Sequence, residues 1–348
     1  MADVVFAVPG DLATPTGGYA YARRLLAHLP QDGLAIRHLP LPASYPHPAP
    51  ADLAETARLV AQTDPDSVLL IDGLAYGAMP RDLIAGFGRR IVALVHHPLG
   101  LEHGLPPDRQ ADLLRREAEA LALAHRVIVT SPLTRRLLTA DFGVPPDKIA
   151  VAEPGTEPAP RARGTGSPVQ ILSVGAVSPR KGYDVLVAAL AMLKDLDWRA
   201  TVAGATDRAA DCAASLRAAV AEAGLSERVA FTGAVDPDRL EALYAQADIF
   251  VSPSLFEGYG MVLAEALAHG LPLVASTGGA AVETVPDSAA LKVLPGDAAA
   301  LAASLRVLIA DPALRARLSD AAWEAGLSLP RWPETAARVA ASLREAAP

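Results

Sequence analysis

The sequence predicts an α/β protein of two domains, each a parallel sheet flanked by helices, and three observations lead to this prediction. Short apolar segments alternate with helical ones from Asp3 onward, which is typical of βα units. The same alternation starts again at Val169. Between the two series, residues 153–168 are rich in Pro, Gly and Ala, which indicates a hinge-like linker. We therefore expect an N-terminal domain over 1–158 and a C-terminal domain over 169–330.

Composition and charge narrow the class of protein. The chain has 348 residues, of which 51% are hydrophobic, and this is enough to fill two cores. Its net charge of −8 argues against general binding to nucleic acid or to an anionic membrane, because both need a basic surface. We expect no nucleic-acid partner and at most peripheral membrane contact. A single cysteine, no evident signal peptide and no apolar run near the ~18–20 residues of a membrane span predict a cytoplasmic protein.

The first domain is expected to open with a strand at residues 3–8, a continuous apolar run typical of a strand buried on both faces. A polar loop follows, with Gly17 and Gly18 at its end, and it opens a helix that runs to about His28. Glycines there would lie at the carboxyl edge of the sheet, where α/β proteins bind ligands, although a plain turn explains them equally well. Further strands are expected near residues 34–39, 68–71, 91–95 and 127–129.

Two adjacent histidines, His96 and His97, follow the strand at 91–95. A histidine at the carboxyl end of a strand can donate a hydrogen bond to a phosphate or a sugar hydroxyl near neutral pH. The alternative is a loop histidine without a function. We favour His96 as the functional residue, with Glu102 and His103 as weaker candidates for the wall of a binding cleft.

The second domain is expected to repeat the pattern, with strands near residues 169–174, 200–203, 229–231, 249–251 and 273–275. Gly175 follows the first of these strands, and Arg180 and Lys181 stand directly ahead of a helix that begins at about Tyr183. Two cations there could neutralise a diphosphate, with charge-assisted hydrogen bonds worth roughly 1.5–3 kcal/mol each. Exposed basic pairs are commoner than phosphate sites, but Lys181 is one of only four lysines, and we favour the phosphate interpretation.

The stretch 252–270 organises the rest of the chain. It leaves an apolar strand, passes through a loop with Gly258 and Gly260, and enters a helix that begins with Met261 and Val262. A strand, a glycine-bearing loop and a helix in this order present unpaired backbone N–H groups to a phosphate, and the helix dipole adds to the attraction.

Two carboxylates accompany this loop: Glu257 precedes the helix and Glu265 lies inside it. A carboxylate repels a phosphate but accepts hydrogen bonds strongly from sugar hydroxyls. Helix geometry over eight residues would put Glu265 about 80° around from Glu257, so one acid could hold a sugar and the other a ribose at the two ends of a diphosphate. This pattern predicts a sugar nucleotide as the ligand. The alternative is an ordinary strand–helix connection with two surface glutamates.

Residues 257–265 resemble the E-x7-E signature of the retaining GT-B glycosyltransferases of family 4, which often have Phe where this chain has Tyr259. The resemblance implies that Glu265 binds the ribose hydroxyls and that Glu257 binds the donor sugar. It also implies that the N–H groups near residues 260–262 receive the diphosphate. The implied fold is GT-B, in which two Rossmann-like domains face an interdomain cleft and a C-terminal helix, here about 331–348, returns to the N-terminal domain.

The resemblance extends to other segments. The family carries Lys-Gly at Lys181 and Gly182, and usually an Arg directly after the glycine at 175, where this chain has Ala176; we infer that Arg180 takes that role. A His-Asp pair often follows the fourth strand in the family, so His96 takes the place of the family His and His97 replaces the Asp.

Two glycine loops are also similar to those of the family. The loop that ends at Gly17 and Gly18 faces the acceptor and the donor phosphate in the family. Residues 276–279, with Glu283 just beyond, resemble the family's glycine-pair loop, and we expect them to line the nucleotide site. Two D-x-D triplets, at 64–66 and 236–238, resemble a metal motif, but we assign both to structure, the first to a turn and the second to a helix cap.

The resemblance implies a retaining glycosyltransferase that needs no metal and no cofactor. It would move a sugar from a GDP- or UDP-sugar to a hydroxyl of a saccharide or lipid-linked acceptor. Arg180 and Lys181 would stabilise the departing diphosphate, while His96 and Glu257 hold the reacting sugar. Two alternatives remain at this point: a GT-B epimerase or hydrolase that acts on the donor without an acceptor, and a non-catalytic nucleotide-sugar-binding protein.

Overall fold

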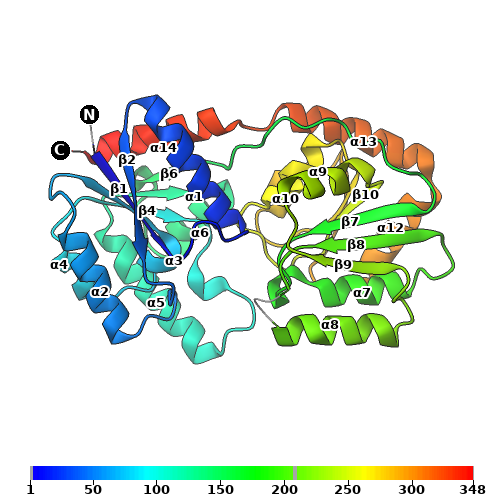
Figure 1. Cartoon of the computed structure of the whole chain (residues 1–348), viewed down its shortest axis with the longest axis horizontal. Helices are drawn as coiled ribbons and strands as arrows, with labels where there is room; N and C mark the ends of the chain where they lie inside the picture. The colour runs from blue at the N-terminus through cyan, green and yellow to red at the C-terminus, as the bar shows by residue number, and fades with distance from the viewer. Residues whose placement is uncertain (1–2, 207–209, 348) are drawn as a thin grey trace. The chain divides into compact units, whose positions relative to one another are not determined.

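The computed structural model describes residues 3–206 and 210–347, and the chain divides into two compact units (Figure 1). Unit 1 comprises residues 1–155 and 330–348, and unit 2 comprises residues 156–329. Each unit is built on a six-stranded sheet whose neighbouring strands all pair in parallel. The predicted fold class, two Rossmann-like α/β domains, is confirmed.

The sheet of unit 1 has the strand order β2-β1-β3-β4-β5-β6. Its strands are β1 (Asp3–Pro9), β2 (Ala35–Leu41), β3 (Val68–Asp72), β4 (Ile91–Val95), β5 (Arg126–Val129) and β6 (Ile149–Val151). Its helices are α1 (Gly17–His28), α2 (Pro50–Ala61), α3 (Gly73–Tyr76), α4 (Arg81–Gly86), α5 (Pro107–Leu123), α6 (Pro132–Asp141) and α14 (Trp332–Ala346). Three 3₁₀ turns complete it: η1 (Leu29–Asp32), η2 (Leu99–Leu101) and η3 (Pro146–Lys148).

The central strands of unit 1 are buried on both faces, which explains their continuous apolar sequences. Every residue of β3 and of β4 is buried. Helix α14 belongs to this unit although it comes last in the chain, since it packs against α1, β5 and β6. Its buried residues include Trp332, Ala336, Val339 and Leu343, a spacing that puts all four on one face of a helix.

The sheet of unit 2 has the strand order β12-β11-β10-β7-β8-β9. Its strands are β7 (Val169–Val174), β8 (Trp198–Ala203), β9 (Val229–Gly233), β10 (Ile249–Ser252), β11 (Leu273–Ser276) and β12 (Ala290–Val293). Its helical elements are η4 (Pro179–Lys181), α7 (Tyr183–Ala191), α8 (Ala210–Glu222), α9 (Pro237–Gln246), α10 (Met261–Ala268), α11 (Ala281–Thr284), α12 (Ala298–Ala310) and α13 (Pro312–Leu327).

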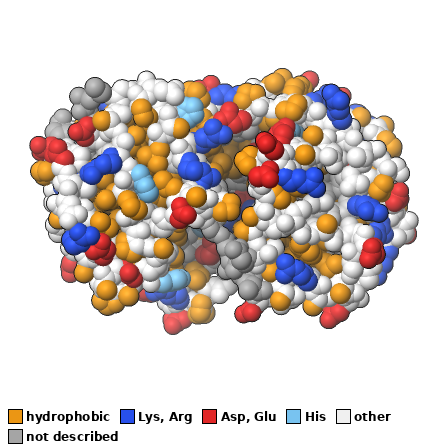
Figure 2. Space-filling view, in the orientation of Figure 1, with side chains coloured by type: hydrophobic (Ala, Val, Ile, Leu, Met, Phe, Trp, Pro, Cys, Tyr) orange, Lys and Arg blue, Asp and Glu red, His pale blue; other side chains and the backbone are white. Residues whose placement is uncertain are grey.

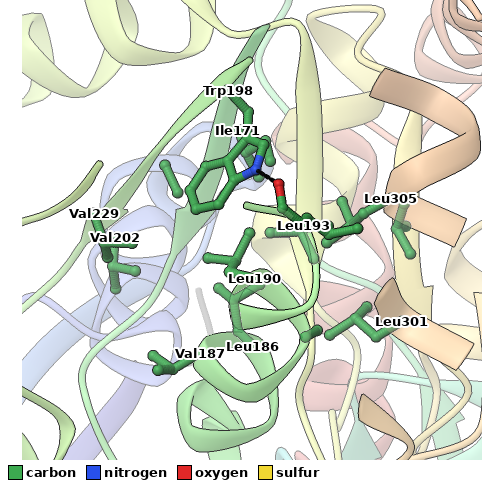
Figure 3. Packing of buried hydrophobic residues seen from close by; sticks show 14 of the residues in the cluster. Ile171, Leu186, Val187, Leu190, Leu193, Trp198, Val202, Val229, Leu301 and Leu305 are labelled. Carbon is green, nitrogen blue, oxygen red and sulfur yellow. Dashed lines mark hydrogen bonds between the residues drawn. The ribbon is translucent and has the colours of Figure 1, made fainter. Parts of the chain in front are cut away.

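Two hydrophobic layers cover the faces of this second sheet, with α7 and α8 on one side and α9 and α10 on the other (Figure 1). Neighbouring residues of β7 alternate between them: Ile171 joins the layer of α7, and Leu172 joins the layer of α10. In the first layer, Trp198 donates its indole N–H to the carbonyl of Leu193 at 2.7 Å (Figure 3). This well-packed support holds the loops at the carboxyl ends of the strands.

The surface carries charges of both signs. Figure 2 shows acidic and basic side chains interspersed over the visible face of each unit. Among the residues that the structure describes, no helix combines the length and the apolar character needed to span a membrane.

Candidate active site

The strand order of unit 2 places two distant loops side by side. From β7 the chain moves outward to β8 and β9, and it then returns to the other side of β7 as β10, with Ile171 paired to Ile249. Ligands of open α/β sheets bind outside the carboxyl ends of the strands where the order reverses in this way. The loop after β7 and the loop after β10 both begin there, and Leu255 N–H donates to the carbonyl of Arg180 at 2.8 Å.

Three of the predicted site residues meet at this point. Lys181 donates from Nζ to Oε1 of Glu257 at 2.6 Å. Arg180 Nη1 lies 3.4 Å from Oε2 of the same carboxylate and donates to the carbonyl of Phe256 at 2.8 Å. Arg180 therefore lies beside Lys181 in the cluster, and its role in place of the family arginine stays a prediction.

Glu257 is buried, with 6% of its surface exposed. Burial alone would raise the pKa of its carboxyl, but Lys181 and Arg180 outweigh burial and hold the pKa at about 2. The carboxylate is therefore ionised at neutral pH. Two cations contact this one carboxylate, which favours the binding of an anion such as a diphosphate, although the acidic Glu265 also lies within range of the charge of Lys181.

Gly175 leaves the room that Lys181 occupies. A Cβ at position 175 would lie 2.9 Å from Cε of Lys181, and the backbone there has φ +152°. The carbonyl of Gly175 accepts a hydrogen bond from the hydroxyl of Tyr183 at 2.9 Å. A side chain at 175 would therefore displace Lys181.

Helix α10 starts at the predicted phosphate loop. Gly260 caps it in the left-handed region, at φ +91°, and the first hydrogen bond of the helix runs from Leu263 N–H to the carbonyl of Gly260 at 2.8 Å. The amides of Met261 and Val262 therefore precede the helical hydrogen-bond ladder. That they receive a phosphate stays a prediction.

The loop ahead of α10 is not helical, and this corrects the estimate of about 80° between the two acids. Glu257 forms a parallel bridge with Gly279: its N–H donates to the carbonyl of Gly278 at 3.1 Å, and its carbonyl accepts from Ala280 N–H at 2.7 Å. Helix geometry applies only from Met261, so it cannot relate the two glutamates. The glycine-pair loop predicted at 276–279 thus contacts the loop of Glu257 directly.

The remaining predicted residues of unit 2 complete this loop. Gly258 is half-buried between Glu257 and Tyr259, and Tyr259 is 7% exposed, with its carbonyl accepting from the hydroxyl of Thr284 at 2.6 Å. Glu265 lies on α10 and accepts at Oε2 from the hydroxyl of Tyr244 at 2.8 Å. Burial raises the pKa of Glu265, although the Tyr244 hydrogen bond and the charge of Lys181 act in the opposite direction.

In unit 1, His96 follows β4 and is enclosed on several sides. Its Nε2 lies 3.4 Å from Oδ2 of Asp72. Its ring meets Tyr21 edge-on, with centroids 5.4 Å apart and planes at 82°. A Cβ on Gly18 would lie 3.5 Å from the ring. The structure thus brings His96 and Gly18 together, and the sheet edge at the end of β3 and β4 holds both Asp72 and His96.

The other candidates of unit 1 differ in part from expectation. Gly17 and Gly18 belong to the first turn of α1, directly after Thr16, instead of ending the loop ahead of it. His97 turns to a different partner, with Nε2 3.1 Å from Oε2 of Glu102. His103 is exposed.

The sequence did not predict three residues that contact His96 or Glu265: Asp72, Tyr21 and Tyr244. Asp72 directly follows the apolar run at 68–71, so the rule that selected His96 at the end of β4 would have selected it too. Tyr21 and Tyr244 lie on helices whose sequences show only amphipathic patterns, and their contacts depend on tertiary packing.

The two D-x-D triplets have structural roles. Asp236 accepts at Oδ1 from Arg239 N–H at 2.7 Å and so caps α9. Asp64 accepts from Asp66 N–H at 3.0 Å within a turn. Across residues 3–206 and 210–347, no group of three or more His, Cys, Asp or Glu side chains is arranged to hold a metal ion.

Known protein families match most of this chain. Residues 6–159 match the family model described as Glycosyltransferase Family 4, and residues 160–324 match Glycosyl transferases group 1. A GDP-mannose-dependent alpha-(1-6)-phosphatidylinositol monomannoside mannosyltransferase of Mycolicibacterium smegmatis is 31% identical over 301 residues, which cover 80% of this chain and 75% of the relative. The chain belongs to glycosyltransferase family 4.

Other relatives of this family 4 glycosyltransferase match over different lengths. A D-inositol 3-phosphate glycosyltransferase of Acidothermus cellulolyticus is 32% identical over 217 residues, 57% of this chain, and the chain spans only about half of that relative, 48% of its length. The structure of sucrose-phosphate synthase from Thermosynechococcus elongatus superposes with a TM-score of 0.85 at 23% identity, covering 99% of both chains, and so shows the shared fold.

Proposed function

We propose that this family 4 enzyme is a retaining, metal-independent glycosyltransferase that moves a sugar from a GDP- or UDP-sugar to a hydroxyl of a saccharide or lipid-linked acceptor. The observation that carries the proposal is the cluster of Arg180, Lys181 and Glu257 at the strand-order reversal of unit 2, next to the start of α10. The relatives reported above, which are named for GDP-mannose and for an inositol phosphate, support a nucleotide-sugar donor and a hydroxyl acceptor.

In the proposed reaction the acceptor hydroxyl oxygen forms the new bond to the anomeric carbon, and the bond from that carbon to the diphosphate oxygen breaks. The hydroxyl proton passes to the departing diphosphate. The departing nucleoside diphosphate gains negative charge, and Arg180, Lys181 and the amides of Met261 and Val262 stabilise it. These fixed protein cations supply the charge neutralisation that other transferases obtain from a metal ion. In unit 1, His96 would donate a hydrogen bond to the reacting sugar, held in place by Tyr21.

The donor is identified by thermal unfolding in the presence of GDP, UDP and their sugar conjugates. One nucleotide series is expected to stabilise the protein, by ~2.7 kcal/mol at a hundredfold excess over the dissociation constant. Transfer from that donor should continue with a chelator present, and nuclear magnetic resonance of the product should show the donor's anomeric configuration. Donor turnover that needs no acceptor would instead assign a hydrolase or an epimerase.

Lys181→Ala tests the cation cluster itself. We expect the transfer rate to fall by about a hundredfold or more, because the leaving diphosphate loses a charged donor, while the fold is retained. Lys194→Ala removes an exposed lysine of the same unit and should leave the rate unchanged. A Lys181→Ala enzyme that transfers at the wild-type rate would refute the assignment.

A further inference from the structure

Glu265 has a fixed partner in Tyr244, a residue of α9. The tyrosine hydroxyl donates to Oε2 of Glu265 at 2.8 Å. Tyr244 is 2% exposed, and its ring stacks on His269, with centroids 4.6 Å apart and planes at 9°, and on Phe250, at 5.9 Å and 19°. Two parallel rings therefore hold the tyrosine, and its hydroxyl points at one oxygen of one carboxylate.

This hydrogen bond gives the two oxygens of the Glu265 carboxylate different roles. Oε2 is occupied by Tyr244, and Oε1 remains to accept from another donor. A carboxylate accepts hydroxyl protons at both oxygens only while it is ionised, and burial of Glu265 opposes ionisation. The Tyr244 hydroxyl and the charge of Lys181 are the groups that favour the ionised form.

The surroundings of Tyr244 keep its hydroxyl in the donor role. Burial and the adjacent Glu265 both raise the pKa of Tyr244, so its hydroxyl keeps its proton. Behind the ring, His269 donates from Nδ1 to the carbonyl of Pro160 at 3.1 Å, and its Nε2 lies 3.4 Å from Oε2 of Glu241. The titratable groups around this pair are therefore Lys181, His269 and Glu241, with Tyr183 acting on Tyr244 at longer range.

We propose that Tyr244 is the positioning residue for ribose recognition: its hydroxyl orients Glu265 and preserves its negative charge, so that the carboxylate accepts hydrogen bonds from the ribose hydroxyls of the donor nucleotide. This inference rests on the proposed function, which assigns Glu265 to the ribose. Tyr244 itself touches no substrate in this scheme. Its effect reaches the nucleotide only through Glu265.

Tyr244→Phe tests the proposal, because phenylalanine keeps the stacked ring and removes only the hydroxyl. Calorimetry measures the affinity for GDP and UDP, each beside its 2′,3′-dideoxy form. The wild type should prefer the ribose form by about tenfold, the usual effect of hydrogen bonds to a charged group. In Tyr244→Phe this preference should shrink to near one, while the affinity for the dideoxy form stays the same.

The pH dependence of binding gives a second readout. Loss of the Tyr244 hydrogen bond raises the pKa of Glu265 further, so the affinity of Tyr244→Phe for the ribose form should fall at a higher pH than in the wild type as the solution is acidified. The dideoxy form should show no such difference. A tyrosine that served only packing would weaken both nucleotides equally and leave the pH profile in place.

Tyr45→Phe is the matched control, since Tyr45 is also buried and its hydroxyl hydrogen-bonds Thr56 at 2.9 Å within unit 1. It should keep the ribose preference. A wild type that binds GDP or UDP without preferring ribose, or a Tyr244→Phe variant that keeps the preference, overturns the inference alone. A wild type that binds neither nucleotide, nor its sugar conjugates, overturns the proposed function with it.

Discussion

The pKa values of two buried glutamates, Glu257 and Glu117, shift in opposite directions because their neighbours differ. Glu257 contacts two cations, which hold its pKa at about 2 against the effect of burial. Glu117, on α5, is 1% exposed and accepts one hydrogen bond, from Leu99 N–H at 2.8 Å. Burial raises the pKa of Glu117 to about 8, and the Leu99 amide offsets this only in part. At neutral pH the first is a carboxylate and the second a neutral acid.

Glu117→Gln should stabilise unit 1 as the pH rises. The pKa of Glu117 in the folded protein, about 8, lies above the usual 4.5. The contribution of the neutral acid to the free energy of unfolding is therefore fully present below pH 4.5 and is lost as the pH rises through 8. Glutamine stays neutral throughout and still accepts from Leu99. Its advantage in the free energy of unfolding should grow by about 1.4 kcal/mol per pH unit across that window.

Urea unfolding at several pH values measures this difference. Glu119→Gln is the control on the same helix, because that side chain is 40% exposed and its ion pair with Arg115 is a surface contact of small effect. Equal stability of Glu117→Gln and the wild type at pH 8 would contradict the buried neutral acid.

The sequence predicts the residue types of the site better than their pairings. Arg180, Lys181 and Glu257 follow from charge and position, but 76 positions separate Lys181 from Glu257, and only the pairing of β7 with β10 brings them to 2.6 Å. Tyr244 illustrates the same limit, since nothing in a helical apolar pattern distinguishes a core tyrosine from one that serves a carboxylate.

At the scale of elements, the start of α10 depends on one backbone conformation. Gly260 has φ +91° and ψ +58°, and a Cβ there would lie 2.7 Å from Cδ1 of Leu263. For a residue with a side chain, the left-handed backbone conformation costs about 1–2 kcal/mol, before any clash is counted. The backbone conformation of Gly260 thus determines how the chain turns from the loop of Glu257 into α10.

Gly260→Ala should therefore weaken the binding of GDP or UDP by about tenfold or more, because relief of the strain moves the amides of Met261 and Val262. Calorimetry measures the affinity. Gly86→Ala is the control: the site on α4 has open space around it, and alanine is a good helix former. Unchanged affinity in Gly260→Ala would show that these amides do not receive the diphosphate.

Most elements could be predicted because apolar runs and glycine loops alternate so regularly. The strand β12 was missed, since its four residues include Lys292 and are flanked by Ala289 and Leu294 without a distinct turn. It lies at the edge of the sheet, where burial is incomplete and the apolar signal is weak. The predicted linker is irregular as expected, but Asp248 ties part of it to unit 2 through the amides of Thr165 and Gly166.

At the scale of the molecule, unit 1 is assembled from both ends of the chain. Trp332, the first residue of α14, packs against Tyr21, with centroids 5.5 Å apart and planes at 69°, and Tyr21 packs against His96. The hydroxyl of Tyr21 donates to the carbonyl of Ala152 at 2.9 Å. The last helix therefore supports the histidine proposed to act on the sugar.

Trp332→Ala should destabilise unit 1 by about 3–5 kcal/mol, the usual cost of emptying a buried tryptophan site, and leave unit 2 unaffected. Hydrogen exchange followed by mass spectrometry resolves the two units. Faster exchange is expected in the strands of residues 3–155 and unchanged exchange in those of 169–293. Arg338→Ala, at an exposed position of the same helix, is the control. Equal loss of protection in both units would contradict the assignment of α14 to unit 1 alone.

Because α14 belongs to unit 1, this unit is complete only after the whole of unit 2 has been synthesised. Translation proceeds at about 5–20 residues per second, so the roughly 180 residues between the end of the first segment of unit 1 and Trp332 take on the order of ten seconds. All six strands of unit 2 have been synthesised by then, while Tyr21 still lacks its contact with Trp332. The unit whose synthesis begins first is therefore completed last.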